Sequence, residues 1–195
     1  TAEIREKVAA GGPAPYSGGR SWIPLAESLN MWKPTIAAIN GYAIAGGFMM
    51  AMQCDIRIIA QSARVGIAEV RWNMGGAGWM APLTRQMHLG HALELCIWGD
   101  EQWDADKCFR TGWANAVAAD DQLDETAMNW AKRILALAPR SSRNIKEALY
   151  RGPYMNPLES SRFGSVLEQN LVGMQDSIEG PKAFAERRVP HFIDG

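Results

Sequence analysis

The first part of the chain alternates short apolar runs with polar or glycine-rich turns. The runs at 35–39, 55–60 and 64–70 are typical of buried strands. Residues 40–47 are predicted to form a turn, and residues 48–54 to begin a buried helix. Short apolar strands separated by helices predict an α/β fold with a parallel sheet that is covered on both faces.

The second part of the chain carries a helical pattern almost throughout. Three helices and one more strand are predicted first, at 79–87, 92–98, 104–111 and 113–118. From Asp120 onward every predicted segment is a helix, and prolines and glycines mark the breaks. These helices cover 121–137, 140–151, 156–173 and 178–187. The pattern therefore divides the chain into an α/β core over 1–118 and a helical region over 119–195.

Two further helices are predicted ahead of the first strand, at 2–10 and from Ser21 to about Trp32, with a segment rich in glycine and proline between them. Residues 1–20 have no apolar core of the kind that a secretory signal needs. The three cysteines are too few and too unevenly spaced for a disulfide framework or a zinc site with paired ligands. These features predict a reducing, cytoplasmic location.

The composition is that of an ordinary folded domain. The 195 residues are 47% hydrophobic and 21% charged, which excludes intrinsic disorder as the main state. Twenty basic and 21 acidic side chains leave a net charge of -1, which argues against a nucleic-acid or anionic-membrane binder. Residues 35–52 are uncharged over the length of a membrane helix, but Asn40 and several glycines interrupt them, so no membrane span is predicted.

A glycine turn that leads into a predicted helix is the first candidate for chemistry. Gly41, Gly46 and Gly47 fall between a strand and a helix. Phe48 and Met49 stand where a phosphate loop needs lysine and serine or threonine, and the dinucleotide spacing of glycines is absent. Backbone N–H groups at such a helix start can receive a carbonyl oxygen or an oxyanion. Close packing of the helix against the strand explains the same glycines equally well.

Glu69 is the second candidate, because it follows an apolar run that resembles a strand. A carboxylate in such a run would be desolvated, which suits it to proton transfer. A glutamate that points to solvent, or pairs with Arg64 or Arg71, fits the same position. A further glycine cluster at 75–78 precedes Trp79 and either makes a tight turn or lines a pocket.

Two sets of polar residues at helical spacing are candidates for metal or nucleic-acid binding. His88 and His91 are three residues apart, but no carboxylate or thiol completes a ligand set, so no metal site is predicted. Arg140, Arg143 and Lys146 recur every three residues. Such a stripe can contact RNA or a phosphate, although a solvated helix face is the simpler interpretation.

Several segments resemble the crotonase (enoyl-CoA hydratase/isomerase) superfamily. The main segment runs from Lys33 to Gly47, as KPTIAAINGYAIAGG, and continues as AMQCD at 51–55 and ARVGIAE at 63–69. Further matches are Leu95 with Gly99-Asp100, and a tail with Ala183-Phe184, Glu186-Arg187-Arg188, Pro190 and Phe192. The similarity covers the chain from about residue 20 onward.

The resemblance implies the ClpP/crotonase fold, a spiral of β-β-α units, with a C-terminal helical region that forms trimers, often paired into hexamers. It also implies an acyl-CoA substrate, with coenzyme A as part of the thioester and no prosthetic group. The Gly46 N–H matches one of two donors that stabilise a thioester enolate. Glu69 matches one of the two catalytic glutamates of the hydratases, and Met49 stands at the position of the other. A single glutamate is the pattern of members that shift a double bond and of some lyases.

Substrate contacts are also implied by the resemblance. Phe184 and Arg187 match tail positions that hold the nucleotide end of coenzyme A, where arginine can pair with a phosphate. Apolar residues near Glu69 are expected to line a bulky acyl pocket, although they also fit a core or a subunit contact. They are Met49, Trp72, Met74 and Trp79.

The front portion of the family has no counterpart in the chain. This implies either a segment ahead of Thr1 or a truncated member, and the alternative function is a catalytically impaired module that binds RNA or a protein partner. Open apolar strands and the apolar residues of the helices from about 121 onward need a covering surface. A homo-trimer or hexamer is therefore expected.

Overall fold

The computed structural model describes residues 6, 9–11, 25–74 and 76–195. The helix predicted at 2–10 falls largely outside these residues. Of the helix predicted from Ser21 to about Trp32, residues 25–32 are described. Only α2 (Leu25–Ser28) is helical there, so the helix ends earlier than predicted, and it packs against the later helix α8.

The strands of the described residues form two three-stranded sheets, so the prediction of one parallel sheet is wrong. The first sheet has the order β1 (Ile36–Ile39), β3 (Ile56–Ala60), β6 (Ala116–Ala118), all parallel. The second has the order β2 (Tyr42–Ile44), β4 (Arg64–Gly66), β5 (Trp103–Asp104), with β5 antiparallel to β4. The strand β2 lies inside the segment that was predicted as a turn. Its three residues are too few for the alternating pattern of a strand to be recognised in the sequence.

Successive β-β-α units place one strand in each sheet. The first unit consists of β1, β2 and α3 (Gly46–Gln53), and the second begins with β3 and β4. The parallel register sets Ile36 against Ile56 in one sheet and Ile44 against Gly66 in the other. The chain therefore rises by one strand in both sheets with each unit, which is a spiral.

The second unit departs from the sequence prediction after β4. The apolar run at 64–70 does not continue as a strand, because a 3-10 helix, η1 (Glu69–Trp72), begins at Glu69. The helices that follow are α4 (Ala77–Met80), η2 (Ala81–Arg85), α5 (Leu89–Ile97) and α6 (Ala105–Arg110). The side chain of Asp104 accepts a hydrogen bond from the Lys107 N–H at 2.8 Å and caps α6.

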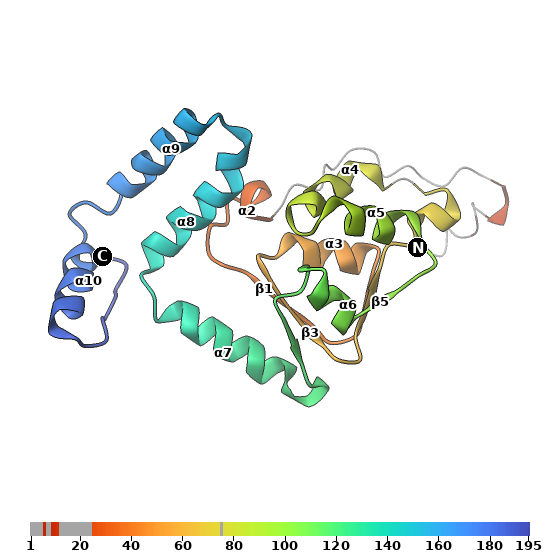
Figure 1. Ribbon diagram of the computed structural model, residues 1–195, viewed down its shortest axis with the longest axis horizontal. Helices are drawn as coiled ribbons and strands as arrows, with labels where there is room; N and C mark the ends of the chain where they lie inside the picture. The colour runs from red at the N-terminus through yellow and green to blue at the C-terminus, as the bar shows by residue number, and fades with distance from the viewer. Residues whose placement is uncertain (1–5, 7–8, 12–24, 75) are drawn as a thin grey trace.

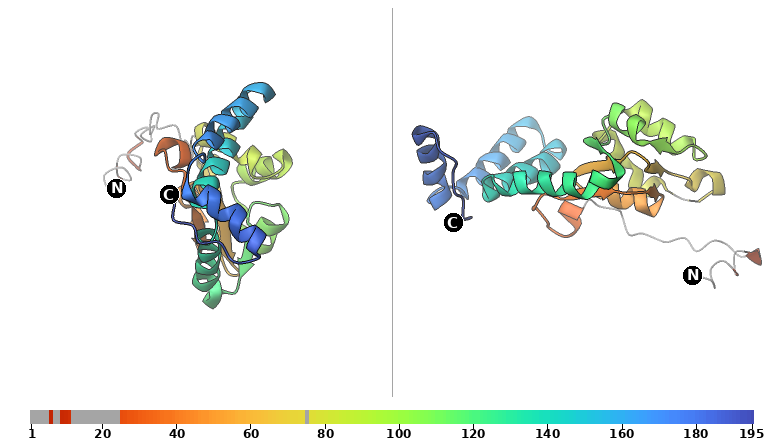
Figure 2. Two further views of the ribbon diagram at one scale, coloured as in Figure 1. Left: turned by 90° about the vertical axis from the view of Figure 1, so that its left-hand side faces the viewer. Right: turned by 90° about the horizontal axis from the view of Figure 1, so that it is seen from below.

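After β6 and the short η3 (Asp120–Gln122) the described chain is helical, as predicted. The helices are α7 (Leu123–Leu135), α8 (Pro139–Arg151), η4 (Gly152–Tyr154), α9 (Pro157–Gln169) and α10 (Gln175–Glu186). A capping box between Asn156 and Glu159 begins α9. Figure 1 shows α7 leading away from the sheets and α10 at the far end of the molecule. Figure 2 shows the same helices as an extension of the core.

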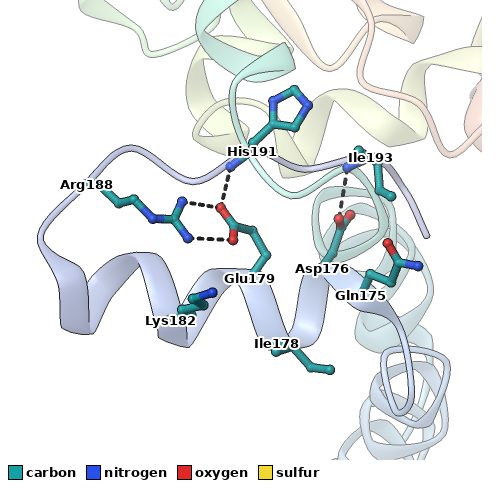
Figure 3. A pocket seen from close by; sticks show the side chains of 8 residues that line it. All are labelled: Gln175, Asp176, Ile178, Glu179, Lys182, Arg188, His191 and Ile193. Carbon is teal, nitrogen blue, oxygen red and sulfur yellow. Dashed lines mark hydrogen bonds and ion pairs between the residues drawn. The ribbon is translucent and has the colours of Figure 1, made fainter.

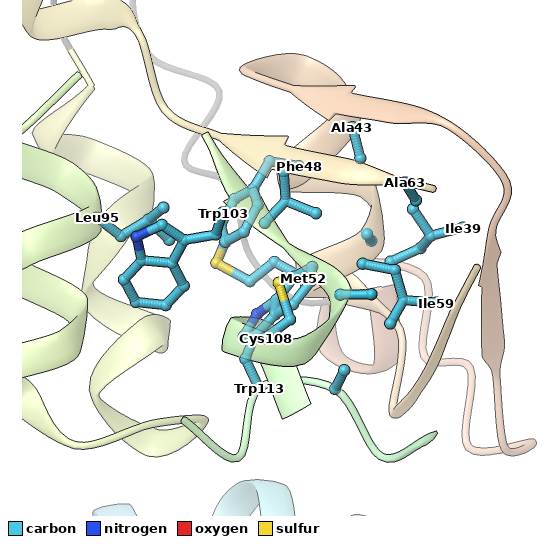
Figure 4. Close-up of a cluster of buried hydrophobic side chains, with 14 of the residues drawn as sticks. Ile39, Ala43, Phe48, Met52, Ile59, Ala63, Leu95, Trp103, Cys108 and Trp113 are labelled. Carbon is cyan, nitrogen blue, oxygen red and sulfur yellow. The ribbon is translucent and has the colours of Figure 1, made fainter. Parts of the chain in front are cut away.

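The core lies between the sheets and the helices α3 and α6. Phe48 stacks on Trp113 with ring centroids 4.6 Å apart, and both side chains are fully buried. Figure 4 shows this pair with Met52 and Cys108 in one cluster. Residues 35–52 form β1, β2 and α3, and no helix among the described residues is long and apolar enough to cross a membrane.

Candidate active site

The start of α3 presents backbone N–H groups at one edge of the second sheet. The Ala45 N–H donates to the Gly66 carbonyl oxygen at 3.0 Å, which ties the turn before α3 to the end of β4. Ala45 has a φ of 51° and closes a sharp turn between β2 and the helix. The first N–H groups of a helix have no acceptor within it. Those of Gly46 and Gly47 therefore point away from α3 and can bind a carbonyl oxygen.

Packing does not require the glycines at this turn. A Cβ on Gly46 would meet Met49 Cε at 3.9 Å, and one on Gly47 would meet Ala43 Cβ at 3.9 Å, both ordinary contacts. Neither glycine has a positive φ. Close packing of helix on strand therefore does not explain the pair, whereas both residues are exposed and leave the N–H groups open to a ligand.

Glu69 leaves the neighbouring strand at the same edge. Because β2 and β4 are parallel with Ile44 opposite Gly66, the residues after both strands meet at one edge of the sheet. Glu69 is the first residue of η1, and its backbone oxygen accepts from the Met74 N–H at 3.0 Å. Its Oε2 is buried and has no hydrogen-bond partner among the described residues. A buried carboxylate oxygen without a donor is unusual.

The surroundings of Glu69 are small or apolar. A Cβ placed on Gly76 would lie 3.7 Å from both Glu69 Cβ and Trp79 Nε1. Cys96 approaches from α5: burial, and then the charge of Glu69, raise the pKa of its thiol to about 11. The thiol therefore stays neutral near pH 7.

The residues expected to line an acyl pocket separate into two pairs. Met49 and Trp79 are buried, and both lie close to the glycines of the site. Trp72 and Met74 are 67% and 55% exposed, and Trp72 lies under the Arg71 guanidinium. The structure thus places Met49 beside Gly46, and Trp79 beside Gly76 and Glu69, whereas Trp72 and Met74 are exposed.

The two residues matched to the nucleotide end of coenzyme A lie on the last helix. Phe184 is 88% exposed on α10, and Arg187 follows that helix with a φ of 54°. In Figure 1, α10 is at the left-hand end of the molecule, well apart from α3, which lies in the core. Phe184 and Arg187 are therefore not brought together with Gly46 and Glu69 within one chain.

Ion pairs hold the tail that carries Arg187 onto α10. Arg188 Nη1 and Nη2 donate to the two oxygens of Glu179 at 2.5 and 2.7 Å, and the His191 N–H donates to Glu179 Oε1 at 2.8 Å. Asp176 accepts in the same way from the N–H groups of Ile193 and Asp194. Figure 3 shows the contacts of Glu179 and the contact between Ile193 and Asp176, which surround an open pocket of about 540 Å³.

The tail is expected to withstand acid to an unusual degree. The hydrogen bond from Arg188 lowers the pKa of Glu179 from 4.5 to about 2. Because the folded-state pKa is depressed, the contact is complete above pH 4.5 and is lost as the pH falls towards about 2. The amide signal of His191, followed by NMR, should titrate with a midpoint near 2, and a midpoint near 4.5 would contradict the contact.

A buried polar cluster that the sequence did not predict joins α8 to the first sheet. Asp55 Oδ2 accepts from the Thr35 N–H at 2.6 Å and from Lys146 Nζ at 2.8 Å, and Oδ1 accepts from the Tyr150 hydroxyl at 2.8 Å. Burial, followed by the bond to Asp55, raises the pKa of Tyr150. Lys146 also donates to the Lys33 carbonyl oxygen at 2.9 Å. Sequence offers only a weak signal for this cluster, because its partners are 95 residues or so apart.

The basic stripe is not the solvated face that the spacing suggested. Lys146 is 7% exposed and paired with Asp55, and Arg140 and Arg143 contact Asp194 of the tail. His88 caps α5 by accepting from the Gly90 N–H. Among the described residues no group of side chains has the make-up of a metal site.

Known proteins are similar to this chain in both sequence and fold. A family model described as enoyl-CoA hydratase/isomerase matches residues 23–195. The (E)-benzylidenesuccinyl-CoA hydratase of Thauera aromatica is 36% identical over 89% of this chain and 68% of its own length. The carnitinyl-CoA dehydratase of Salmonella typhi is 31% identical over 94% of this chain and 73% of its own.

Solved structures give the same result. A putative enoyl-CoA hydratase/isomerase from Mycobacterium abscessus superimposes with a TM-score of 0.79 and 30% identity, over 88% of this chain and 73% of that one. An enoyl-CoA hydratase from Mycobacterium tuberculosis H37Rv gives 0.82 and 27% identity, over 97% and 75%.

The spiral of β-β-α units defines an α/β enzyme of the crotonase fold. The chain belongs to the enoyl-CoA hydratase/isomerase family. Its fold and its class of enzyme are therefore those that the resemblance implied.

Proposed function

We propose that this chain moves a proton on an enoyl-CoA thioester through an enolate, and that the double-bond shift is its main reaction. The observation that carries the proposal is the meeting, at one sheet edge, of the open N–H groups of α3 with a buried carboxylate oxygen of Glu69. One group can hold the developing oxyanion and the other can hold the proton.

The proposed reaction uses the Gly46 N–H as an oxyanion donor and Glu69 as a base and then as an acid. The thioester oxygen accepts a hydrogen bond from the Gly46 N–H, which lowers the energy of the enolate. Removing one such donor typically costs about 3–4 kcal/mol of transition-state stabilisation. Glu69 takes the proton from the α-carbon and becomes a neutral acid, and it returns that proton to the γ-carbon. The carbon skeleton then carries the same atoms with the double bond moved by one position.

Met49 supports the choice of a one-carboxylate reaction. Its thioether lies near Gly46, where the resemblance implies the second glutamate of the hydratases. A thioether has no proton to give and cannot activate water by general base catalysis. Water addition at this site would therefore depend on Glu69 alone.

Hydration is the second candidate, because two relatives are named as a hydratase and a dehydratase. The two reactions are separated by offering but-3-enoyl-CoA and but-2-enoyl-CoA to the protein and identifying the products by chromatography. The proposal predicts conversion of the first to the second faster than water addition to the second. If water addition were the faster reaction, hydration would be the assigned function. If the protein catalysed neither reaction, both candidate functions would be wrong.

We also infer that the nucleotide end of coenzyme A is held by the tail of a second copy in a homo-trimer or hexamer. Phe184 and Arg187 lie far from Gly46 in their own chain (Figure 1). The C-terminal helices also expose large apolar side chains that a neighbouring subunit would cover. They include Leu135, Ile145, Val166 and Ile178.

Arg187→Gln is expected to raise KM for the acyl-CoA about ten-fold with little change in kcat, because a charge-assisted contact to a phosphate is lost and the reacting groups are untouched. Arg162→Gln, an exposed arginine on α9, is the control and should leave KM unchanged. Steady-state kinetics measures both. An unchanged KM in the Arg187 variant, or a light-scattering mass of one folded 21.5 kDa chain, would contradict the shared site.

A further inference from the structure

A second pocket lies at the other end of α3 from the candidate active site. Its volume is about 280 Å³. The helix begins at Gly46 and ends at Gln53, and the pocket opens beside the next residue, Cys54. Its walls come from the start of β3, from η2 and from α8, and they consist of Cys54, Asp55, Arg57, Pro82, Arg85, Gln86, Leu149 and Tyr150. Nothing in the proposed reaction uses these residues.

The one carboxylate of the pocket is already satisfied. Asp55 accepts hydrogen bonds from Thr35, Tyr150 and the Lys146 ammonium, so a buried cation offsets its charge. Burial raises the pKa of the Cys54 thiol, which keeps that side chain neutral as well. The walls therefore present no unpaired negative charge.

Two arginines of the walls form no ion pair with a carboxylate among the described residues. Arg57 is 6% exposed, and its guanidinium donates only to the backbone oxygens of Trp113 and Cys54, at 2.5 and 2.8 Å. Arg85 lies over the ring of Tyr154 at 3.9 Å. A guanidinium has five N–H donors, so both side chains keep donors for a further partner.

A neutral acceptor completes the walls. Gln86 donates from Nε2 to the Met52 carbonyl oxygen at 2.8 Å, which fixes the orientation of its amide. Its Oε1 is buried and has no hydrogen-bond partner among the described residues. An unpaired buried acceptor calls for a donor on whatever occupies the pocket.

We propose that this pocket binds a small carboxylate that also carries a hydroxyl or N–H donor. The carboxylate bonds to the Arg57 and Arg85 guanidinium groups, and the donor bonds to Gln86 Oε1. A volume of about 280 Å³ holds a molecule of a few carbon atoms and excludes a nucleotide-bearing acyl-CoA. Because α3 joins the pocket to the Gly46 turn, an occupant would lie against the C-terminal end of the helix that presents the oxyanion donors.

Isothermal titration calorimetry of the full chain with lactate tests the proposal, with acetate and inorganic phosphate as comparison probes. Lactate should bind in the millimolar range, and acetate several-fold more weakly because it has no donor for Gln86. Arg85→Gln should weaken lactate binding about ten-fold or more, since a charge-assisted hydrogen bond is lost. The control Arg110→Gln removes an exposed arginine on α6 and should leave binding unchanged.

Leu149→Glu gives a second test that does not depend on a buried residue. Leu149 is 70% exposed at the pocket, so a carboxylate is tolerated there and repels the ligand. Lactate binding should fall in this variant too, with the circular dichroism spectrum unchanged. Absence of lactate binding to the unmodified chain, binding that both variants retain in full, or tighter binding of phosphate than of lactate would each overturn the proposal.

Discussion

Glu69→Gln is expected to lower the turnover of an enoyl-CoA thioester by about 10²–10⁴-fold and to leave its Kd nearly unchanged. Glutamine has the size and shape of glutamate but cannot accept and return the proton. Neither Trp79 nor Cys96, which lie near Glu69, can replace it as a base near pH 7. Single-turnover kinetics with but-3-enoyl-CoA gives the rate of the chemical step, and equilibrium titration gives Kd.

Glu168→Gln is the matched control, because it makes the same change at an exposed position on α9. Turnover of this variant should equal that of the unmodified chain. If Glu69→Gln retained full turnover, Glu69 would not carry the proton. If the thioester no longer bound to that variant, the loss of activity would reflect binding rather than proton transfer.

Asp55→Ala is expected to lower the free energy of unfolding by about 3–5 kcal/mol, because it leaves the buried Lys146 ammonium without its counter-charge. Lys146 is 7% exposed and Asp55 16%, and the pair is 2.8 Å apart. The Thr35 and Tyr150 groups that donate to Asp55 would lose their acceptor as well. Equilibrium unfolding in urea measures the change.

Asp106→Ala is the control for this prediction. Asp106 pairs with Arg110 on α6, but both side chains are more than two thirds exposed. Exposed pairs of this kind contribute about 0.5 kcal/mol or less. Equal losses in the two variants would contradict the account, since they would mean that Asp55 and Lys146 behave as a surface pair.

The helices and the longer strands followed from the sequence because each leaves a local pattern. Proline and glycine mark the ends of α7, α8 and α9, and the apolar run at 55–60 coincides with β3 apart from its first residue. The strand β2 has three residues and β5 has two, which is too short for a pattern. Their pairing with β4 is a long-range property, so the division into two sheets could not be predicted.

Local sequence singles out candidate residues for the site but not their arrangement. Gly46 lies in a glycine turn and Glu69 follows an apolar run, and the parallel register of β2 and β4 places the ends of both strands at one edge of the sheet. The local structure of Glu69 differs from a strand, because η1 begins there. The partners of Lys146 could not be predicted, since an ion pair between residues 55 and 146 leaves no trace in local spacing.

The most direct test of the proposed proton transfer by Glu69 measures where deuterium from C2 of the substrate is found in the product. But-3-enoyl-CoA with deuterium in place of both hydrogens on C2 is converted in ordinary water, and the product is examined by mass spectrometry and NMR. Because Glu69 Oε2 is buried, the deuteron that it removes should exchange slowly with solvent. Transfer by Glu69 predicts but-2-enoyl-CoA with deuterium on C4 in a measurable share of the molecules. A product in which every new C4 hydrogen comes from water would contradict it.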